Sequence, residues 1–140
     1  MARAWRYRVT LGISAVTLIG TAVGELPPWV YKERQIKAPE SLVIKVRSVV
    51  RTETAEADGK SIAFKVIAEV EKVERTSTRL MPGAVIEIRY LQHNYSQPMA
   101  GPSEVPALKE GQVCPAYLES AVEGRSYSPA AGGFSFTQLD

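Results

Sequence analysis

Thiol and imidazole side chains are almost absent from this 140-residue chain, which holds one cysteine, Cys114, and one histidine, His93. A single cysteine cannot form an internal disulfide, so stability has to come from packing. A protein zinc site needs three or four converging ligands, typically His or Cys, and we therefore expect no metal site and no cofactor. A Cys-His nucleophile pair would require the fold to bring the two side chains together, and no activating signature surrounds Cys114.

The stretch QVCPAYLES, residues 112–120, gives the cysteine a structural interpretation. Cys114 alternates with Ala116 and Leu118 at the two-residue period of a strand, which predicts a row of side chains that face the core. Buried free cysteine behaves as a small apolar residue. Pro115 cannot donate to a sheet ladder, so the strand should be at an edge or interrupted there. We interpret Cys114 as a packing residue, with an intermolecular disulfide as the alternative.

No apolar run reaches the roughly 20 residues that a membrane-spanning helix needs. The longest extends from Val9 to about Val23, follows the basic stretch MARAWRYR and ends in the small-residue pattern Ala-Val-Gly. This is the layout of a secretory signal peptide over residues 1–24, and we expect cleavage before Glu25. An uncleaved membrane anchor is the alternative, in which residues 9–23 would contact the membrane.

The chain also lacks a large net charge of either sign once residues 1–24 are set aside. The whole chain has 17 Lys and Arg against 15 Asp and Glu, and three of the basic residues but no acidic residue lie in the leader, which leaves 14 against 15 and a net charge of −1. Nucleic-acid binding is therefore not indicated. We expect a secreted, periplasmic or cell-surface protein, or a membrane-anchored one with its domain outside the cytoplasm if the leader is retained.

The rest of the chain has the pattern of short strands without βαβ alternation. Residues 25–41 hold three prolines and no sustained period, which predicts an extended lead-in. Apolar and polar residues alternate over 42–51, from residue 62 onward, over 84–91 and over 112–120, and a last strand is expected within 126–139. Asp58-Gly59 predicts a hairpin, and a change of parity at Val73 predicts a bulge near Glu71-Lys72. Residues 92–111, rich in proline, predict a long loop.

These elements predict one all-β domain over residues 42–140. Five strands, tight turns and one long insertion between the third and fourth strands favour a small five-stranded OB-like barrel. An open antiparallel β-sandwich is the alternative.

Four short stretches give this pattern a family resemblance. They are Val70-Glu71-Lys72-Val73, Leu80-Met81-Pro82-Gly83, Leu108-Lys109-Glu110-Gly111 and Ala116-Tyr117-Leu118. In this order the chain resembles the OB-fold barrels of the netrin-module and tissue-metalloprotease-inhibitor type from residue 42 to about 139. The inhibitors of that group chelate a catalytic zinc through an N-terminal cysteine and are cross-linked by disulfides. This chain has neither feature, so the resemblance implies a fold and not an inhibitory activity.

We predict a non-catalytic, exported binding or accessory module. Exposed aromatics on long loops make contacts, which selects His93, Tyr95 and Met99 in the 92–111 loop. Lys45, Arg47 and Arg51 alternate on the first strand and predict a basic stripe on one outward side. The expected partner is another envelope or extracellular protein, or an anionic surface.

Two other functions stay open at this stage. Glu69 and Glu71 share one face of the second strand, and a pair of carboxylates could serve a small hydrolase. The alternating charges from Glu69 to Arg75 are, however, typical of a solvated face that resists aggregation. The other alternative is a membrane-tethered structural domain held by residues 9–23.

Overall fold

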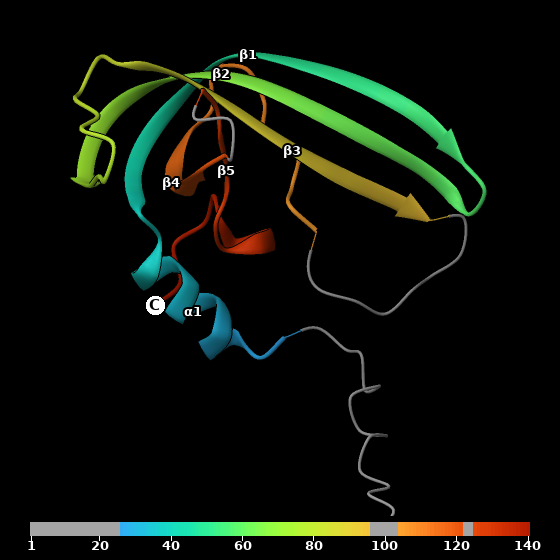
Figure 1. Ribbon diagram of the computed structural model, residues 1–140, viewed down its shortest axis with the longest axis horizontal. Coiled ribbons are helices and arrows are strands. Elements are labelled where there is room, and N and C mark those ends of the chain that lie inside the picture. The colour runs from blue at the N-terminus through green and yellow to red at the C-terminus, as the bar shows by residue number, and fades with distance from the viewer. Residues whose placement is uncertain (1–25, 96–103, 122–124) are drawn as a thin grey trace, which may run out of the picture.

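The strands of this protein close into a barrel. The computed structural model describes residues 26–95, 104–121 and 125–140. The barrel order is β1-β2-β3-β5-β4, and all neighbours are antiparallel except β3 and β5, which bridge in parallel at Ile88 and Tyr127 (Figure 1). The elements are α1 (Pro28–Lys37), β1 (Glu40–Glu56), β2 (Gly59–Arg75), β3 (Val85–Tyr95), β4 (Val113–Ser120), β5 (Tyr127–Pro129) and the 3-10 helix η2 (Gly132–Phe134). This confirms the predicted all-β, five-stranded barrel, and the open sandwich is wrong because the order closes.

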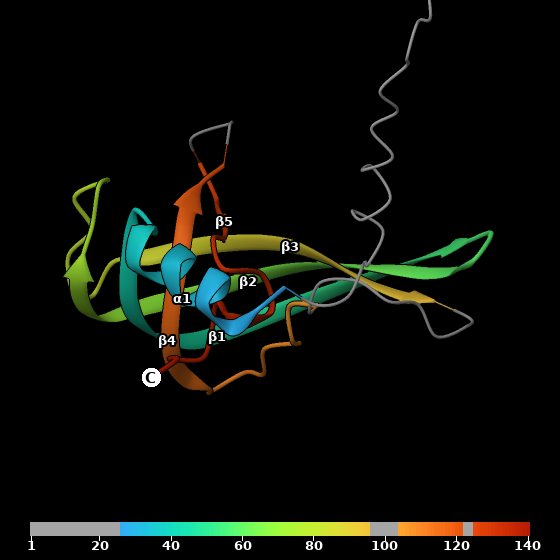
Figure 2. The same ribbon diagram turned by 90° about the horizontal axis from the view of Figure 1, so that it is seen from below.

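The first three strands are longer than the barrel needs and continue beyond it. Their far ends form what we call the arm: residues 48–56 of β1, 59–66 of β2 and 89–95 of β3 (Figures 1 and 2). β1 and β2 meet in a tight turn in which Glu56 pairs with Gly59, so the predicted Asp58-Gly59 hairpin is confirmed. Gly59 has φ 150°, and a Cβ there would lie 2.1 Å from the backbone oxygen of Asn94. Glycine therefore permits the close approach of β3 to the turn.

The ladder between β1 and β2 has three register shifts, and two of them set the direction of the side chains along most of both strands. Val43 pairs with Lys72 while Ile44 pairs with Val70, which leaves Glu71 without a partner and confirms the predicted bulge. A further shift in β1 lies between Val46 and Ser48 and leaves Arg47 unpaired. Beyond Arg47 the odd-numbered residues of β1 point toward the core side. We call the side of the sheet that carries the core the inner face and the opposite side the outer face.

The core lies on the inner face and is continuous through the barrel into the arm. Its aromatic part is a stack of Phe64 on Tyr90, with ring centroids 4.8 Å apart. The hydroxyl of Tyr90 donates to the carbonyl of Pro106 at 2.9 Å and accepts from the amide of Leu108 at 3.2 Å, which fixes the chain before β4 beneath the arm. The buried cluster comprises Leu42, Ile44, Val46, Ile62, Phe64, Val66, Ala68, Val70, Ile86, Ile88, Tyr90, Leu108, Cys114, Ala116, Leu118 and Phe136.

The extended lead-in predicted for residues 25–41 is wrong, because a helix occupies most of it. Pro28 stands at the start of α1, where proline costs no hydrogen bond. Tyr31 and Gln35, one turn apart, are the buried residues of α1. The Gln35 amide donates to the carbonyls of Phe134 and Thr137 at 2.8 and 2.6 Å, so the helix is held by the C-terminal segment. β1 also begins earlier than predicted, at Glu40.

The C-terminal strand is shorter than predicted. Of residues 126–139 only Tyr127–Pro129 pair as a strand, and the chain then turns through η2, because Gly132 adopts the left-handed φ of 54°. Phe136 is buried in the main core, while Phe134 packs on Tyr31 with ring centroids 4.7 Å apart. Within the described ranges, no helix is long and apolar enough to cross a membrane. The predicted leader, residues 1–24, lies outside them.

Candidate functional site

The predicted basic stripe of β1 is divided between the two faces of the sheet. Lys45 and Arg47 are exposed on the outer face, where Arg47 forms an ion pair with Glu69. Arg51 lies on the inner face, because it pairs with the buried Phe64 and its guanidinium carbon lies 5.3 Å from that ring centroid. A single stripe of Lys45, Arg47 and Arg51 is therefore wrong, and the bulge at Arg47 is the physical reason.

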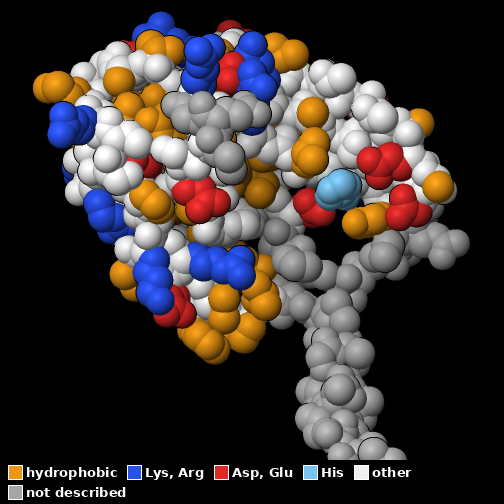
Figure 3. Space-filling view, in the orientation of Figure 1, with side chains coloured by type: hydrophobic (Ala, Val, Ile, Leu, Met, Phe, Trp, Pro, Cys, Tyr) orange, Lys and Arg blue, Asp and Glu red, His pale blue; other side chains and the backbone are white. Residues whose placement is uncertain are grey.

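The predicted loop residues are also placed differently. His93 and Tyr95 belong to β3, so the long loop begins after Tyr95 and not at residue 92. Their rings stack with centroids 6.0 Å apart and 20° between planes. Both lie on the outer face, since Ile86, Ile88 and Tyr90 alternate with them on the inner one. The histidine, pale blue in Figure 3, lies at the surface of the arm among acidic side chains. Met99 lies outside the described residues.

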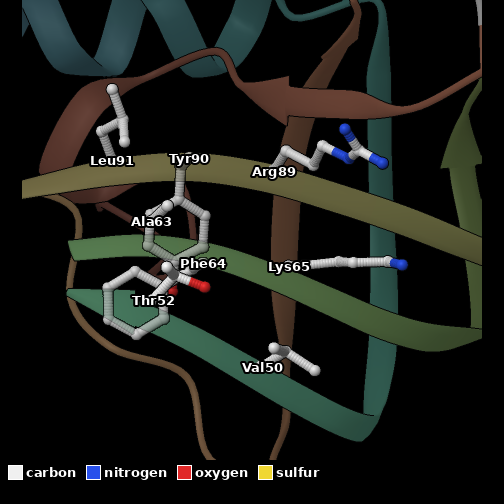
Figure 4. Close-up of a pocket in the computed structure, with 8 residues that line it drawn as sticks. All are labelled: Val50, Thr52, Ala63, Phe64, Lys65, Arg89, Tyr90 and Leu91. Carbon is white, nitrogen blue, oxygen red and sulfur yellow. The ribbon is translucent and has the colours of Figure 1, made fainter. Parts of the chain in front are cut away.

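A shallow, open hollow of about 490 Å³ lies on the arm. Val50, Lys65 and Arg89 follow one another across β1, β2 and β3, and Figure 4 shows the lysine and arginine side chains extending in the same direction. The next row across the strands is Thr52, Ala63 and Leu91. These six side chains belong to the outer face, and Phe64 and Tyr90 complete the lining.

The hollow combines exposed apolar side chains with polar ones. Val50 and Leu91 are each 55% exposed, and they lie in neighbouring rows of the same face. One row further along the arm lie Thr54, Ser61 and His93, and Tyr95 follows beyond them. The outer face of the arm thus presents, one row after another, apolar groups, hydroxyls and a stacked aromatic pair.

Two cations and one carboxylate set the charge at the barrel end of the hollow. Glu87 accepts from Arg89 Nε at 2.8 Å and lies 3.4 Å from Lys65 Nζ. The hydrogen bond from Arg89 keeps the pKa of Glu87 below its ordinary value, so this carboxylate is ionised at neutral pH. One carboxylate between two cations leaves a net positive charge beside the apolar groups, which favours an acidic group on a bound ligand.

The carboxylates of the alternative hydrolase lie apart from the hollow on the arm. Glu69 is engaged by Arg47, and Glu71 is the exposed bulge residue on the adjacent part of β2. Neither lines the hollow on the arm. Among the residues that the structure describes, no group of three or more His, Cys, Asp or Glu side chains could hold a metal ion.

Cys114 pairs with Ile44 of β1 and is part of the buried core. At Pro115 the strand pairs only with β1, because the ladder to β5 begins at Leu118. The burial of Cys114 was predicted from the alternation in QVCPAYLES, and the interruption from the missing N–H of Pro115. Burial raises the pKa of the Cys114 thiol to about 11, so the thiolate is scarce at neutral pH.

We therefore expect Cys114 to react with a thiol reagent at least roughly a thousandfold more slowly in the folded protein than in denaturant, since only the rare thiolate is reactive and access requires opening. The measurement is absorbance on addition of an aromatic disulfide at pH 8 with and without urea. Fast labelling of the folded chain would contradict a packing role and favour the intermolecular disulfide.

Comparison of the whole chain with family models, curated proteins and solved structures finds no match. The resemblance to netrin-module barrels remains a prediction. Sequence reasoning selected His93 and Tyr95 but missed the hollow beside them. The signal was present, because Arg89, Leu91, His93 and Tyr95 are spaced by two residues and share one face of a strand.

Proposed function

We propose that this chain is an exported, non-catalytic binding module whose OB-like barrel holds its ligand across the outer face of β2 and β3. The observation that carries the proposal is the hollow with exposed Val50 and Leu91 next to Lys65 and Arg89. Export rests on the leader pattern of residues 1–24.

The strand order supports this face as the binding surface. OB-fold barrels bind oligonucleotides and oligosaccharides on the face of their second and third strands, next to the loop between the first two. Here the hollow lies on β2 and β3, and the β1–β2 turn and the His93–Tyr95 stack lie at the end of the same surface. The correspondence is one of fold; it supports this location for the site and does not indicate the ligand.

The chemistry of the hollow indicates the ligand class. Val50 and Leu91 favour an apolar group, while Lys65 and Arg89 share a single carboxylate and favour an acidic one. A peptide segment with neighbouring apolar and acidic residues would supply both groups. We therefore propose that the partner is another envelope or extracellular protein.

The test is recovery of partners from the native envelope by the wild-type chain and by the double variant Lys65→Glu, Arg89→Glu. Each reversal places like charge against an acidic ligand group, so we expect recovery to fall roughly tenfold or more. A matched control, Lys72→Glu with Lys109→Glu, makes the same change of charge outside the hollow and should recover partners as wild type does.

Three outcomes are informative in this experiment. Equal recovery by the double variant and the wild type would remove the hollow as the site. Equal loss in the control would mean that net charge, and not the hollow, determines binding. Recovery of an anionic polysaccharide in place of a protein would keep the surface and replace the proposed partner.

A further inference from the structure

The β1 edge of the arm has no strand of the described chain beside it. The ladder between β1 and β4 ends where Lys45 pairs with Val113, and the last backbone bonds there join Val46 to Gly111 and Gln112. From residue 48 to residue 56, β1 pairs with β2 alone, and no described residue forms a backbone hydrogen bond with its other edge. Figures 1 and 2 both show this part of β1 extending away from the barrel.

An unpaired edge of this length is a template for another strand. Proteins that keep such an edge single shield it with charged side chains, proline or bulges, or cover it. Here the charges at its centre are of opposite sign: Arg51 and Glu53, two residues apart and both on the inner face, since their partners Phe64 and Ile62 are buried. Opposite charges in this spacing suit pairing of the edge with itself.

We propose that a second copy of this chain pairs with β1 through this edge, antiparallel and with Thr52 on the two-fold axis. In this register Arg51 lies opposite Glu53 of the second copy, and Glu53 lies opposite its Arg51. Val49 lies opposite Ala55 on the same face. Residues directly opposite each other in antiparallel strands are about 4.5–5.5 Å apart at Cβ, so both ion pairs can form at once.

The charges select this register over its neighbours. Sliding the strands by two residues in one direction places Arg51 opposite Arg51, and sliding by two in the other places Glu53 opposite Glu53. Like charges directly opposite are destabilising. Among the described residues neither side chain has a strong competing partner, because Arg51 lies over the Phe64 ring and Glu53 is only in an exposed pair with Lys60 at 3.4 Å.

The pairing has a consequence for the hollow on the outer face. Val50 and Thr52 line it from β1, the strand that would become central in the dimer. Thr54 of the second copy would lie opposite Val50, and the two Thr52 residues would lie opposite each other. The two hollows would therefore flank the two-fold axis on one continuous sheet, and a ligand long enough could contact both copies.

The first test is charge reversal followed by charge exchange, read by sedimentation equilibrium of the full chain. Arg51→Glu alone and Glu53→Arg alone place like charges opposite each other at two points, and we expect dimer dissociation constants to rise roughly a hundredfold. The double variant Arg51→Glu, Glu53→Arg restores both pairs and should dimerise as wild type does. Lys72→Glu is the matched control on the central strand β2.

A monomeric wild type at the highest soluble concentration would overturn the proposal. So would a dimer that the single reversals leave intact, since the contact would then lie elsewhere. Circular dichroism of each variant separates a lost contact from a lost fold, and the double variant is the safeguard, because misfolding would not be repaired by exchanging the charges.

The second test addresses the register directly, in a Cys114→Ala background. Thr52→Cys places two thiols opposite each other across the axis and should give a disulfide-linked dimer on mild oxidation. Thr54→Cys is equally exposed, but the two copies of residue 54 would be about 14 Å apart at 3.4 Å per residue and should stay monomeric on a reducing-agent-free gel. Equal cross-linking of both variants would contradict this register.

Discussion

Replacing Phe64 by alanine is expected to lower the free energy of unfolding by about 3–5 kcal/mol, the usual cost of removing a buried phenylalanine. Phe64 is 2% exposed and stacks on Tyr90, and Arg51 covers its ring from β1. The variant loses the contacts that join all three strands of the arm. Urea denaturation followed by circular dichroism gives the change.

The same substitution should also loosen the segment under the arm. Tyr90 holds Pro106 and Leu108 through its hydroxyl, and its ring position depends on Phe64. Faster hydrogen exchange at the Leu108 amide is therefore expected in the variant. The matched control is Val50→Ala, on the outer face of the same arm and 55% exposed, which should change stability by no more than about 0.5 kcal/mol. A loss below 1 kcal/mol for Phe64→Ala would mean that the arm does not depend on its inner face.

The contrast between Phe64 and Val50 shows how far alternation predicts this fold. On β2 the apolar residues from Ile62 to Val70 keep one parity, so the inner face and the bulge at Glu71 follow from the sequence. On β1 the bulge at Arg47 was missed, because Val49 and Val50 are adjacent and supply an apolar side chain to either face. For the same reason Arg51 was predicted on the outward face, although it lies on the inner one.

The helix α1 was missed for a different physical reason. Only two of its residues are buried, so no amphipathic period is visible in the sequence. Its stability comes from Gln35, whose amide binds carbonyls at the other end of the chain, and from Tyr31 against Phe134. Contacts between residues about a hundred positions apart are invisible to local patterns.

The candidate site was predicted in part. The aromatic residues His93 and Tyr95 were selected as loop residues, but they act as part of a strand face that already carries Arg89 and Leu91. The prolines that follow made the region look like a loop from its beginning. The register of the three strands brings the lining residues together, since Val50, Lys65 and Arg89 are far apart in sequence and adjacent only in the sheet.

A second large effect is expected at Glu40, a fully buried carboxylate where α1 passes into β1. Its Oε1 accepts from the amide and hydroxyl of Ser77 at 3.0 and 2.8 Å and from those of Thr78 at 3.1 and 3.0 Å. Glu40→Ala leaves these donors without their acceptor. Ser77 and Thr78 are exposed and can be rehydrated, but a hydrogen bond to a charged group contributes about 1.5–3 kcal/mol, so we expect a loss of about 3 kcal/mol in thermal or urea unfolding at neutral pH.

The contribution of Glu40 should depend on pH in a defined direction. Burial raises the pKa of this carboxyl, but hydrogen bonds from Thr76, Ser77 and Thr78 lower it by more, so its pKa lies below the ordinary value of 4.5. The ionised form therefore stabilises the fold above pH 4.5, and that stabilisation is lost as the pH falls through the depressed pKa. The stability difference between wild type and Glu40→Ala should accordingly be constant near neutrality and shrink in acid. Glu71→Ala, at the exposed bulge, should cost no more than about 0.5 kcal/mol. A difference for Glu40→Ala that grows in acid would mean that burial, and not the hydrogen bonds, dominates at Glu40.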